Sequence, residues 1–210
     1  PRRAAPHRIC IAQGDGIGPE IMEATLRVLA AARAPLEVRP VQMGLSCWNA
    51  GVTSGIDAST WDSIRELGVL LKGPLSTPQG AGMKSLNVTL RKRLGLFANV
   101  RPVRAYMPYL VVIRENEEDL YAGIEHRQTD DVVQCLKLVS RQGSERVIRY
   151  AFEYARTRKR QRLTCMTKDN IMKLTDGLFH RVFDEVAREY PDVQTEHLIV
   201  DIGMARAAAE

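Results

Sequence analysis

The first third of the chain alternates between short apolar segments and amphipathic helical segments, and no other feature of the sequence limits its fold as strongly. A strand pattern at residues 8–13 (RICIAQ) precedes a helical pattern at 20–33, in which apolar residues recur every three or four positions. Strand patterns at 36–42 and 69–71 then enclose a helical stretch at 59–67. This β-α-β-α-β order predicts an α/β fold with a largely parallel sheet covered by helices.

The middle of the chain is less regular. Residues 97–103, 110–114 and 132–140 have strand patterns. Pro102 and Pro108 interrupt this region, and prolines inside strand patterns are typical of a sheet edge or of a crossover between domains.

The last third returns to the βαβ order. An amphipathic helical pattern at 147–155 precedes a strand pattern at 163–167. A stronger helical pattern at 178–190 leads to a strand pattern at 197–200. The chain then ends in MARAAAE, which begins as a helix without a stop signal, and we interpret this as the absence of a C-terminal part.

Length and composition indicate a globular protein with a substantial core. The chain has 210 residues, 45% hydrophobic and 26% charged, and this length allows one large or two small domains. We place the boundary near Leu96 and predict domains at 1–96 and 97–210. The sequence shows no apolar run of the length that a bilayer span needs and no signal-peptide pattern, so we expect a cytoplasmic protein without a membrane partner.

The charge and the cysteines narrow the choice of ligands. A net charge of +5 suits anionic ligands, and the densest basic run is RTRKRQR at 156–162. No aromatic residues are interleaved in that run, so we expect no nucleic-acid partner. The four cysteines show no C-x-x-C spacing, which argues against a cysteine zinc site or a disulfide framework.

Two glycine-rich segments follow predicted strands. The turn GDGIGP at 14–19 has Pro19 where the Rossmann G-x-G-x-x-G pattern requires its last glycine, so the sequence disfavours that mode of dinucleotide binding. The loop at 73–82 follows the strand at 69–71, at the end of the sheet where open α/β proteins bind ligands. It is either a functional loop or a long surface connection.

Polar residues suited to anions follow that loop. Ser85, Asn87 and Arg91 lie near a predicted helix start, and Arg101 lies on the next predicted strand. Backbone amides, a hydroxyl, a side-chain amide and guanidinium groups together suit carboxylates or phosphates. Each residue alone would also fit an ordinary role, since Ser85 could cap the helix and the arginines could be solvated.

A second set of polar residues follows predicted strand ends further along the chain. Arg114 ends one strand and precedes Tyr121, Lys168 and Asn170 follow another, and Asp201 closes a third. A lysine at the carboxyl edge of a sheet can accept a proton, a tyrosine can donate one, and a carboxylate can bind a hard divalent cation. Tyr121 and Lys168 could instead be ordinary surface residues, and Asp201 could cap the next helix.

Several linked motifs identify a family. These motifs are GDGIGPEI, LKGPLSTPQGAGMKSLNVTLRKRLGLFANVRPVR, VVIRENEEDLYAGIEH, TKDNIMKLTDGLF and HLIVD. With them in this order, the chain resembles the isocitrate and isopropylmalate dehydrogenases, which are metal-dependent decarboxylating β-hydroxyacid dehydrogenases. The resemblance implies the two-domain α/β fold of that family, with a cleft between the domains, rather than a Rossmann fold.

The resemblance also implies roles in substrate binding. Arg91, Arg101 and Arg114 would clamp the substrate carboxylates, and Ser85 and Asn87 would select the substrate. Within the family, the S-x-N pair before the first arginine resembles the corresponding residues of the bacterial-type isocitrate dehydrogenases. Isopropylmalate dehydrogenases instead have a pocket for an apolar chain at that position.

The remaining roles concern proton transfer, metal and cofactor. Tyr121 would protonate the enolate, and Lys168, with Asn170 beside it, would assist loss of the hydroxyl proton. Asp201 would bind Mg²⁺ or Mn²⁺. The cofactor-binding pair would be Ser76 and Thr77, beside the nicotinamide of NAD or NADP.

The resemblance thus implies oxidative decarboxylation of isocitrate to 2-oxoglutarate and CO₂ by a homodimer with shared active sites. Lys168, Asn170 and Asp201 would reach into the partner's site. Two departures keep alternatives open: the family's further metal carboxylates and adenosine-binding loop are not found before Glu210, and the connection at 104–110 is shorter than in most relatives. The alternatives are oxidation of isopropylmalate or homoisocitrate, or a non-catalytic subunit or inactive fragment.

Overall fold

The computed structural model describes residues 5–76, 85–103 and 110–209. The chain divides into two compact units, Pro1–Leu90 and Arg91–Glu210. The division falls inside helix α4 (Leu86–Leu94). The domain boundary at Leu96 stays a prediction.

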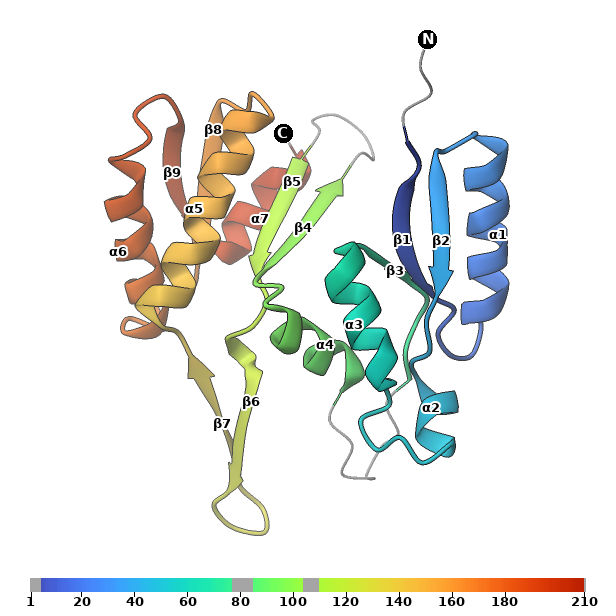
Figure 1. Ribbon diagram of the computed structural model, residues 1–210. Helices are drawn as coiled ribbons and strands as arrows, with labels where there is room; N and C mark the ends of the chain where they lie inside the picture. Colours follow the sequence, from blue (N-terminus) through green and yellow to red (C-terminus); the bar gives the residue numbers. More distant parts are fainter. Residues whose placement is uncertain (1–4, 77–84, 104–109, 210) are drawn as a thin grey trace. The chain divides into compact units, whose positions relative to one another are not determined.

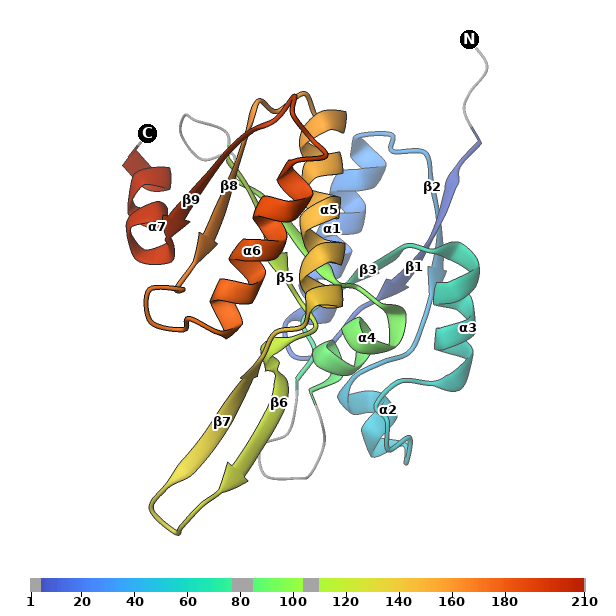
Figure 2. The ribbon, with the colours of Figure 1, turned by 90° about the vertical axis from the view of Figure 1, so that its left-hand side faces the viewer.

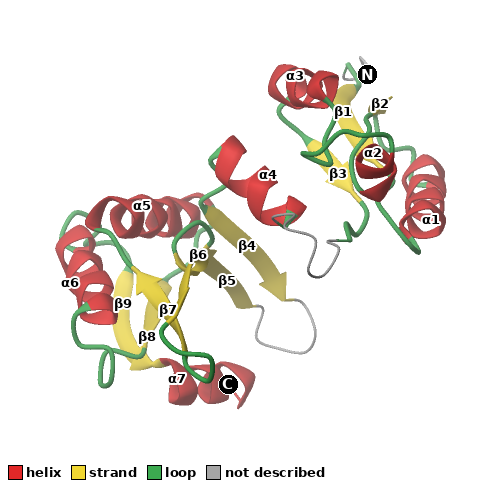
Figure 3. Cartoon of the chain, turned by 90° about the horizontal axis from the view of Figure 1, so that it is seen from below, coloured by secondary structure: helices red, strands yellow, loops and turns green. Residues whose placement is uncertain are grey.

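The first unit contains the parallel sheet that the alternation predicts. Its strands lie in the order β2-β1-β3 and are all parallel, and α1 and α3 lie on opposite sides of them (Figures 1 and 3). The elements in chain order are β1 (His7–Ala12), α1 (Gly18–Ala31), β2 (Leu36–Pro40), α2 (Leu45–Asn49), α3 (Ala58–Leu67) and β3 (Leu70–Lys72). On one face of the sheet, Ile9 and Ile11 pack against Met22 of α1 and form one apolar cluster of this unit.

The turn after β1 contains a glycine in close contact with another segment and a buried carboxylate. A Cβ on Gly14, which has a φ of +81°, would lie 2.2 Å from the Pro74 carbonyl oxygen, so only glycine fits there. The carboxylate of Asp15 accepts hydrogen bonds from the backbone amides of Leu45 and Ser76, at 2.9 and 2.8 Å. This turn therefore holds the segment after β3 in place.

The second unit has three separate strand pairs. The pairs β4–β5 and β6–β7 are antiparallel, whereas β8 and β9 are parallel. In chain order after α4 the elements are β4 (Ala98–Val103), β5 (Leu110–Glu115), β6 (Asp119–Arg127), β7 (Val133–Leu138), α5 (Arg141–Thr157), β8 (Arg162–Thr167), α6 (Thr175–Ala187), β9 (Gln194–Ile199) and α7 (Val200–Ala209). The helices α5 and α6 lie on one side of β8 and β9, and α7 lies on the other (Figure 3).

The sequence analysis did not predict the short helix α2 or strand β6. With β7, strand β6 forms a hairpin that extends away from the α5–α6 layer (Figure 2). Its strand pattern is weak because most of its side chains are exposed on both faces, which removes the alternation of apolar and polar residues.

An aromatic stack forms the centre of the core in the second unit. Phe152 of α5 is fully buried, and its ring lies 4.6 Å from that of Tyr190 and 5.5 Å from that of Phe183, measured between centroids. Val147, Ile148, Val182 and Val186 complete this cluster. The helical stripes found in the sequence thus face one another, because α5 and α6 bury their apolar sides together.

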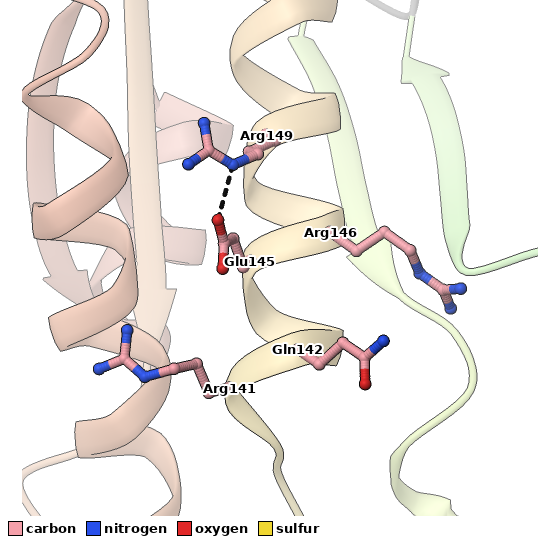
Figure 4. A pocket seen from close by; sticks show the side chains of 5 residues that line it. All are labelled: Arg141, Gln142, Glu145, Arg146 and Arg149. Atoms are coloured by element: carbon pink, nitrogen blue, oxygen red, sulfur yellow. Dashed lines mark hydrogen bonds and ion pairs between the residues drawn. The ribbon is translucent and has the colours of Figure 1, made fainter.

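The outer surface of α5 and α6 is covered with ion pairs. A shallow pocket on α5 is lined by Arg141, Gln142, Glu145, Arg146 and Arg149 (Figure 4). The Nε of Arg149 donates to Glu145 at 2.8 Å (Figure 4). Arg141 pairs with Glu185, and Arg149 also pairs with Glu189, and both of these carboxylates lie outside this helix. In the basic run that follows, Arg156 pairs with Asp192 at 2.5 Å. These pairs offset much of the positive charge of this face.

No described helix has the length and apolarity that crossing a membrane would need.

We expect Phe152→Ala to lower the free energy of unfolding by about 3–5 kcal/mol, because it leaves a cavity beneath two stacked rings. Tyr150→Ala, at a 37% exposed position of the same helix, should cost about 1 kcal/mol or less. Urea denaturation of both variants measures the difference. An equal loss of unfolding free energy in the two variants would show that the packing of the Phe152 ring does not hold α5 in place.

Candidate functional site

Lys168 and Asp201 meet at one edge of the β8–β9 pair. The two strands are parallel, with Thr167 opposite Ile199, so the residues that follow them leave the sheet together. The Lys168 Nζ donates to the Asp201 Oδ1 at 2.6 Å. The two residues thus share a sheet edge. Asp201 lies in the first turn of α7, so the expectation that it closes a strand is wrong.

This ion pair is open to solvent on its acidic side. The Asp201 side chain is 66% exposed, and the hydrogen bond from Lys168 lowers the pKa of its carboxyl. Asp201 is therefore ionised at neutral pH and accessible to a cation. Asn170 lies two residues after Lys168 and is also exposed.

The backbone of Lys168 is held by a buried carboxylate. The Lys168 amide donates to the Asp176 Oδ2 at 2.6 Å, and the other oxygen of Asp176 pairs with Lys137 of β7 at 2.5 Å. Burial alone would lower the pKa of Lys137, but the hydrogen bond that Lys137 donates to Asp176 and the charge of Asp119 outweigh it and raise that pKa. Lys137 is thus charged, and the pair ties the hairpin to the start of the loop that carries Lys168.

Arg101 and Arg114 lie on the same face of the β4–β5 pair. Asn99 is opposite Arg114, and Arg101 is two residues further along β4, so the two arginines are diagonal neighbours. The Arg101 Nε donates to the Asn99 side chain at 3.0 Å. The Arg114 guanidinium lies 5.1 Å from the ring centroid of Tyr121, which joins these two predicted site residues.

Arg114 is poorly satisfied by the described part of the chain. Its Nε is buried and has no hydrogen-bond partner among the described residues. A buried unpaired donor costs free energy, and ligand-binding sites are where such groups are found. Arg114 is therefore a strong candidate for binding an anion.

A groove in the second unit brings several of these residues together. It has a volume of about 880 Å³, and its lining includes Arg114 and Tyr121 as well as Lys137, Thr167 and Asp176. The paired guanidinium and phenol groups thus border the same space as the carboxylate that holds the Lys168 backbone.

Helix α4 carries two of the predicted residues, Asn87 and Arg91, and a third lies just before it. Ser85 precedes the helix, and its carbonyl accepts from the Thr89 amide at 2.9 Å, in the manner of a helix start. Asn87 and Arg91 are four residues apart, so they share one face of α4, and both are half-buried. Ser85 and Asn87 belong to the first unit and Arg91 to the second. The convergence of Arg91 with Arg101 and Arg114 stays a prediction.

The structure describes only one of the two predicted cofactor-binding residues. Ser76 is exposed, and its amide is fixed by the carboxylate of Asp15. Thr77 lies outside the described residues.

The sequence analysis missed the residues that support the site. Asp15 and Asp176 lie in the motifs GDGIGPEI and TKDNIMKLTDGLF, and Lys137 lies in none. Their supporting role is not visible in the sequence, because each acts through a contact between segments that are distant in the chain. A cluster formed by Asp169, His180 and His197 was also missed. The acidic residue in TKDN and the histidine in HLIVD both lie in motifs of the family, but nothing in their spacing relates them to His180.

The donor set at Asp201 is compatible with Mg²⁺ or Mn²⁺ but is small. These ions prefer oxygen ligands, and Mg²⁺ often takes only one or two carboxylates and several waters. Among the described residues, no group of three possible ligands includes Asp201. Asp201 can therefore supply one ligand of a site whose other ligands come from elsewhere.

Comparison with known proteins places these residues in a family. The model of the isocitrate/isopropylmalate dehydrogenase family matches residues 8–209. The isocitrate dehydrogenase [NADP] of Rickettsia bellii is 53% identical over 96% of this chain and 44% of its own length. The chain thus spans less than half of that relative.

Solved structures agree with the sequence match. A crystal structure of a protein from Thermus thermophilus superimposes with a TM-score of 0.88 at 51% identity, over 97% of this chain and 43% of the other. The isocitrate dehydrogenase of Methylococcus capsulatus gives a TM-score of 0.85 at 41% identity, over 96% and 63% of the two chains. The chain belongs to the isocitrate/isopropylmalate dehydrogenase family and has its α/β fold.

We expect Asp176→Ala to lower the free energy of unfolding by about 2–3 kcal/mol. This is less than the 3–5 kcal/mol typical of a broken buried pair, because Asp119 still faces Lys137. The Lys168 amide should also exchange its hydrogen faster. The control is Asp131→Ala at an exposed position, which should change stability by less than about 0.5 kcal/mol. An unchanged exchange rate at Lys168 would show that Asp176 does not hold this segment.

Proposed function

We propose that the complete protein to which this chain belongs catalyses the oxidative decarboxylation of isocitrate to 2-oxoglutarate and CO₂. The observation that carries the proposal is the placement of Asn87 and Arg91 on one face of α4, after Ser85, in a chain of this family. A hydroxyl and an amide beside a guanidinium suit a carboxylate, whereas an apolar substituent would leave them unpaired.

Substrate binding in this proposal depends on three guanidinium groups. Arg91, Arg101 and Arg114 would each pair with carboxylate oxygens and fix the reacting carbon. The same-face placement of Arg101 and Arg114 and the unpaired Arg114 Nε support this role. Ser85 and Asn87 would bind the carboxylate that distinguishes isocitrate from isopropylmalate.

Proton transfer in this proposal depends on Lys168 and Tyr121. Lys168 must leave its ion pair with Asp201 and lose a proton before it can assist loss of the substrate hydroxyl proton. Asn170 would orient the substrate beside it. Tyr121 would donate a proton to the enolate carbon after CO₂ leaves, and the guanidinium of Arg114 lies beside its ring.

The metal and the cofactor would complete this chemistry. When bound, Mg²⁺ or Mn²⁺ polarises the oxygen on the reacting carbon, and NAD or NADP accepts the hydride. Asp201 would be one ligand of the metal. Ser76 and Thr77 would lie beside the nicotinamide.

We further propose a homodimer in which each active site takes residues from both chains. Arg91, Arg101, Arg114 and Tyr121 would come from one chain and Lys168, Asn170 and Asp201 from its partner. The exposed apolar residues of the β6–β7 hairpin support an interface, since Val133 is 60% and Leu136 52% exposed. An isolated hairpin is marginally stable in water, and a partner would cover these side chains.

We expect the double variant Ser85→Ala, Asn87→Leu in the full-length protein to reduce kcat/KM for isocitrate by about 10²–10⁴-fold. Two hydrogen bonds to a charged group, at about 1.5–3 kcal/mol each, would be lost. Turnover of isopropylmalate should change by less than about tenfold, because its apolar chain makes no use of them.

Steady-state kinetics with both substrates checks this prediction, with Thr89→Val on the same helix as control. Equal losses on both substrates would refute the selective role of Ser85 and Asn87. A wild-type protein that prefers isopropylmalate or homoisocitrate would overturn the choice of isocitrate, and one that turns over none of them would favour a non-catalytic subunit or fragment.

We expect a heterodimer of full-length Lys168→Met and Arg101→Ala chains to regain about half of the wild-type activity. One of its two sites contains both intact residues and the other contains neither. The two chains are co-expressed with different tags, the heterodimer is purified through both, and its activity is compared with each parent dimer. A purified heterodimer as inactive as its parents would place both residues in the same chain's site.

A further inference from the structure

Three side chains with metal-binding atoms converge on the side of the β8–β9 pair that α6 covers. Asp169 follows β8, His180 lies on α6 and His197 lies on β9, so three packed elements each contribute one residue. Their ligand atoms all lie within 4.8 Å of one another. None of the three takes part in the chemistry proposed for isocitrate.

The distances between these ligand atoms are close to those of a tetrahedral metal site, one shorter and one longer. The Asp169 Oδ2 lies 2.7 Å from the His180 Nδ1 and 3.7 Å from the His197 Nε2. Around a tetrahedral zinc ion with bonds of about 2.0–2.1 Å, neighbouring ligand atoms are about 3.3 Å apart. Small side-chain rotations would therefore bring the three atoms to the required spacing.

A second carboxylate lies near His180. The Asp184 Oδ2 lies 3.7 Å from the His180 Nε2, on the opposite side of the ring from Asp169. Histidines that bind metals usually donate the proton of their other nitrogen to a carboxylate. Without a metal, the 2.7 Å contact between the His180 Nδ1 and Asp169 is a hydrogen bond. A metal bound at Nδ1 would replace the proton between these two atoms and favour the tautomer with its proton on Nε2, on the side of Asp184.

The second histidine is also suited to a metal. Its ring stacks on that of His180, with centroids 3.5 Å apart. The Thr167 hydroxyl, 2.8 Å from the same Nε2, is a competing hydrogen-bond partner that the metal must displace.

We propose that Asp169, His180 and His197 form a binding site for a transition-metal ion of the zinc type, with Asp184 as an outer carboxylate. Two imidazoles and one carboxylate suit Zn²⁺ better than Mg²⁺, which prefers an all-oxygen shell. The site uses neither Lys168 nor Asp201. A bound ion would join the segment after β8 to α6 and β9 and would thereby fix the residue next to Lys168.

An NMR titration that follows the imidazole signals tests this proposal without substituting any residue of the cluster. Zn²⁺ is added to the full chain carrying Cys135→Ser, which removes the exposed thiol, in excess Mg²⁺, which occupies oxygen sites. Proton–carbon NMR then follows the four histidines. At one equivalent of Zn²⁺ we expect the signals of His180 and His197 to move together, while those of His126 stay in place.

Calorimetry with variants supplies the second test. We expect one Zn²⁺ per chain, at least tenfold weaker binding in His180→Asn and in His197→Asn, and about tenfold weaker binding in Asp184→Asn. His126→Asn, at an exposed position of β6, is the matched control and should change affinity by less than about twofold. Melting temperatures without metal show whether each variant folds.

Two results would overturn the proposal. In one, the NMR signals of His180 and His197 move with pH but not with Zn²⁺, which would mean that a proton alone bridges the cluster. In the other, folded His180→Asn and His197→Asn bind Zn²⁺ as tightly as the unchanged chain, which would place the ion elsewhere.

Discussion

The carboxylate of Asp176 connects the parts of the second unit on which the site depends. One of its oxygens accepts from the Lys168 amide, and the other pairs with Lys137. A buried carboxylate is stable only when its oxygens are satisfied, so moving either the hairpin or the Lys168 segment would leave a charge without a partner. The ion pair between Lys168 and Asp201 forms on a backbone that is already fixed.

The strands and helices could be predicted where the chain alternates regularly. The parallel β1–β2–β3 sheet and the β8–α6–β9 unit follow from local periodicity, and the second of these brings Lys168 and Asp201 together. Strand β6 could not be found in this way, because a hairpin exposed on both faces has no apolar period.

The support of the site depends on long-range contacts that no local pattern encodes. Asp176 resembles any acidic residue at a helix start, yet it pairs with Lys137 in a hairpin far away in the sequence. The cluster around His180 has the same origin, since its members come from a loop, a helix and a strand. By contrast, the arginines and Ser85 were found because the family resemblance carries them as motifs.

The close contact of two backbone segments in the first unit restricts how this protein can change during evolution. Gly14 would place a Cβ 2.2 Å from the Pro74 carbonyl oxygen, and Gly73 would place one 2.0 Å from the Gln13 carbonyl oxygen. Each glycine meets backbone of the other segment, so a compensating side-chain change cannot make room for a substitution at either position. Each position therefore has to remain glycine for its own reason, and a substitution at either one is possible only if the backbone of a loop moves first.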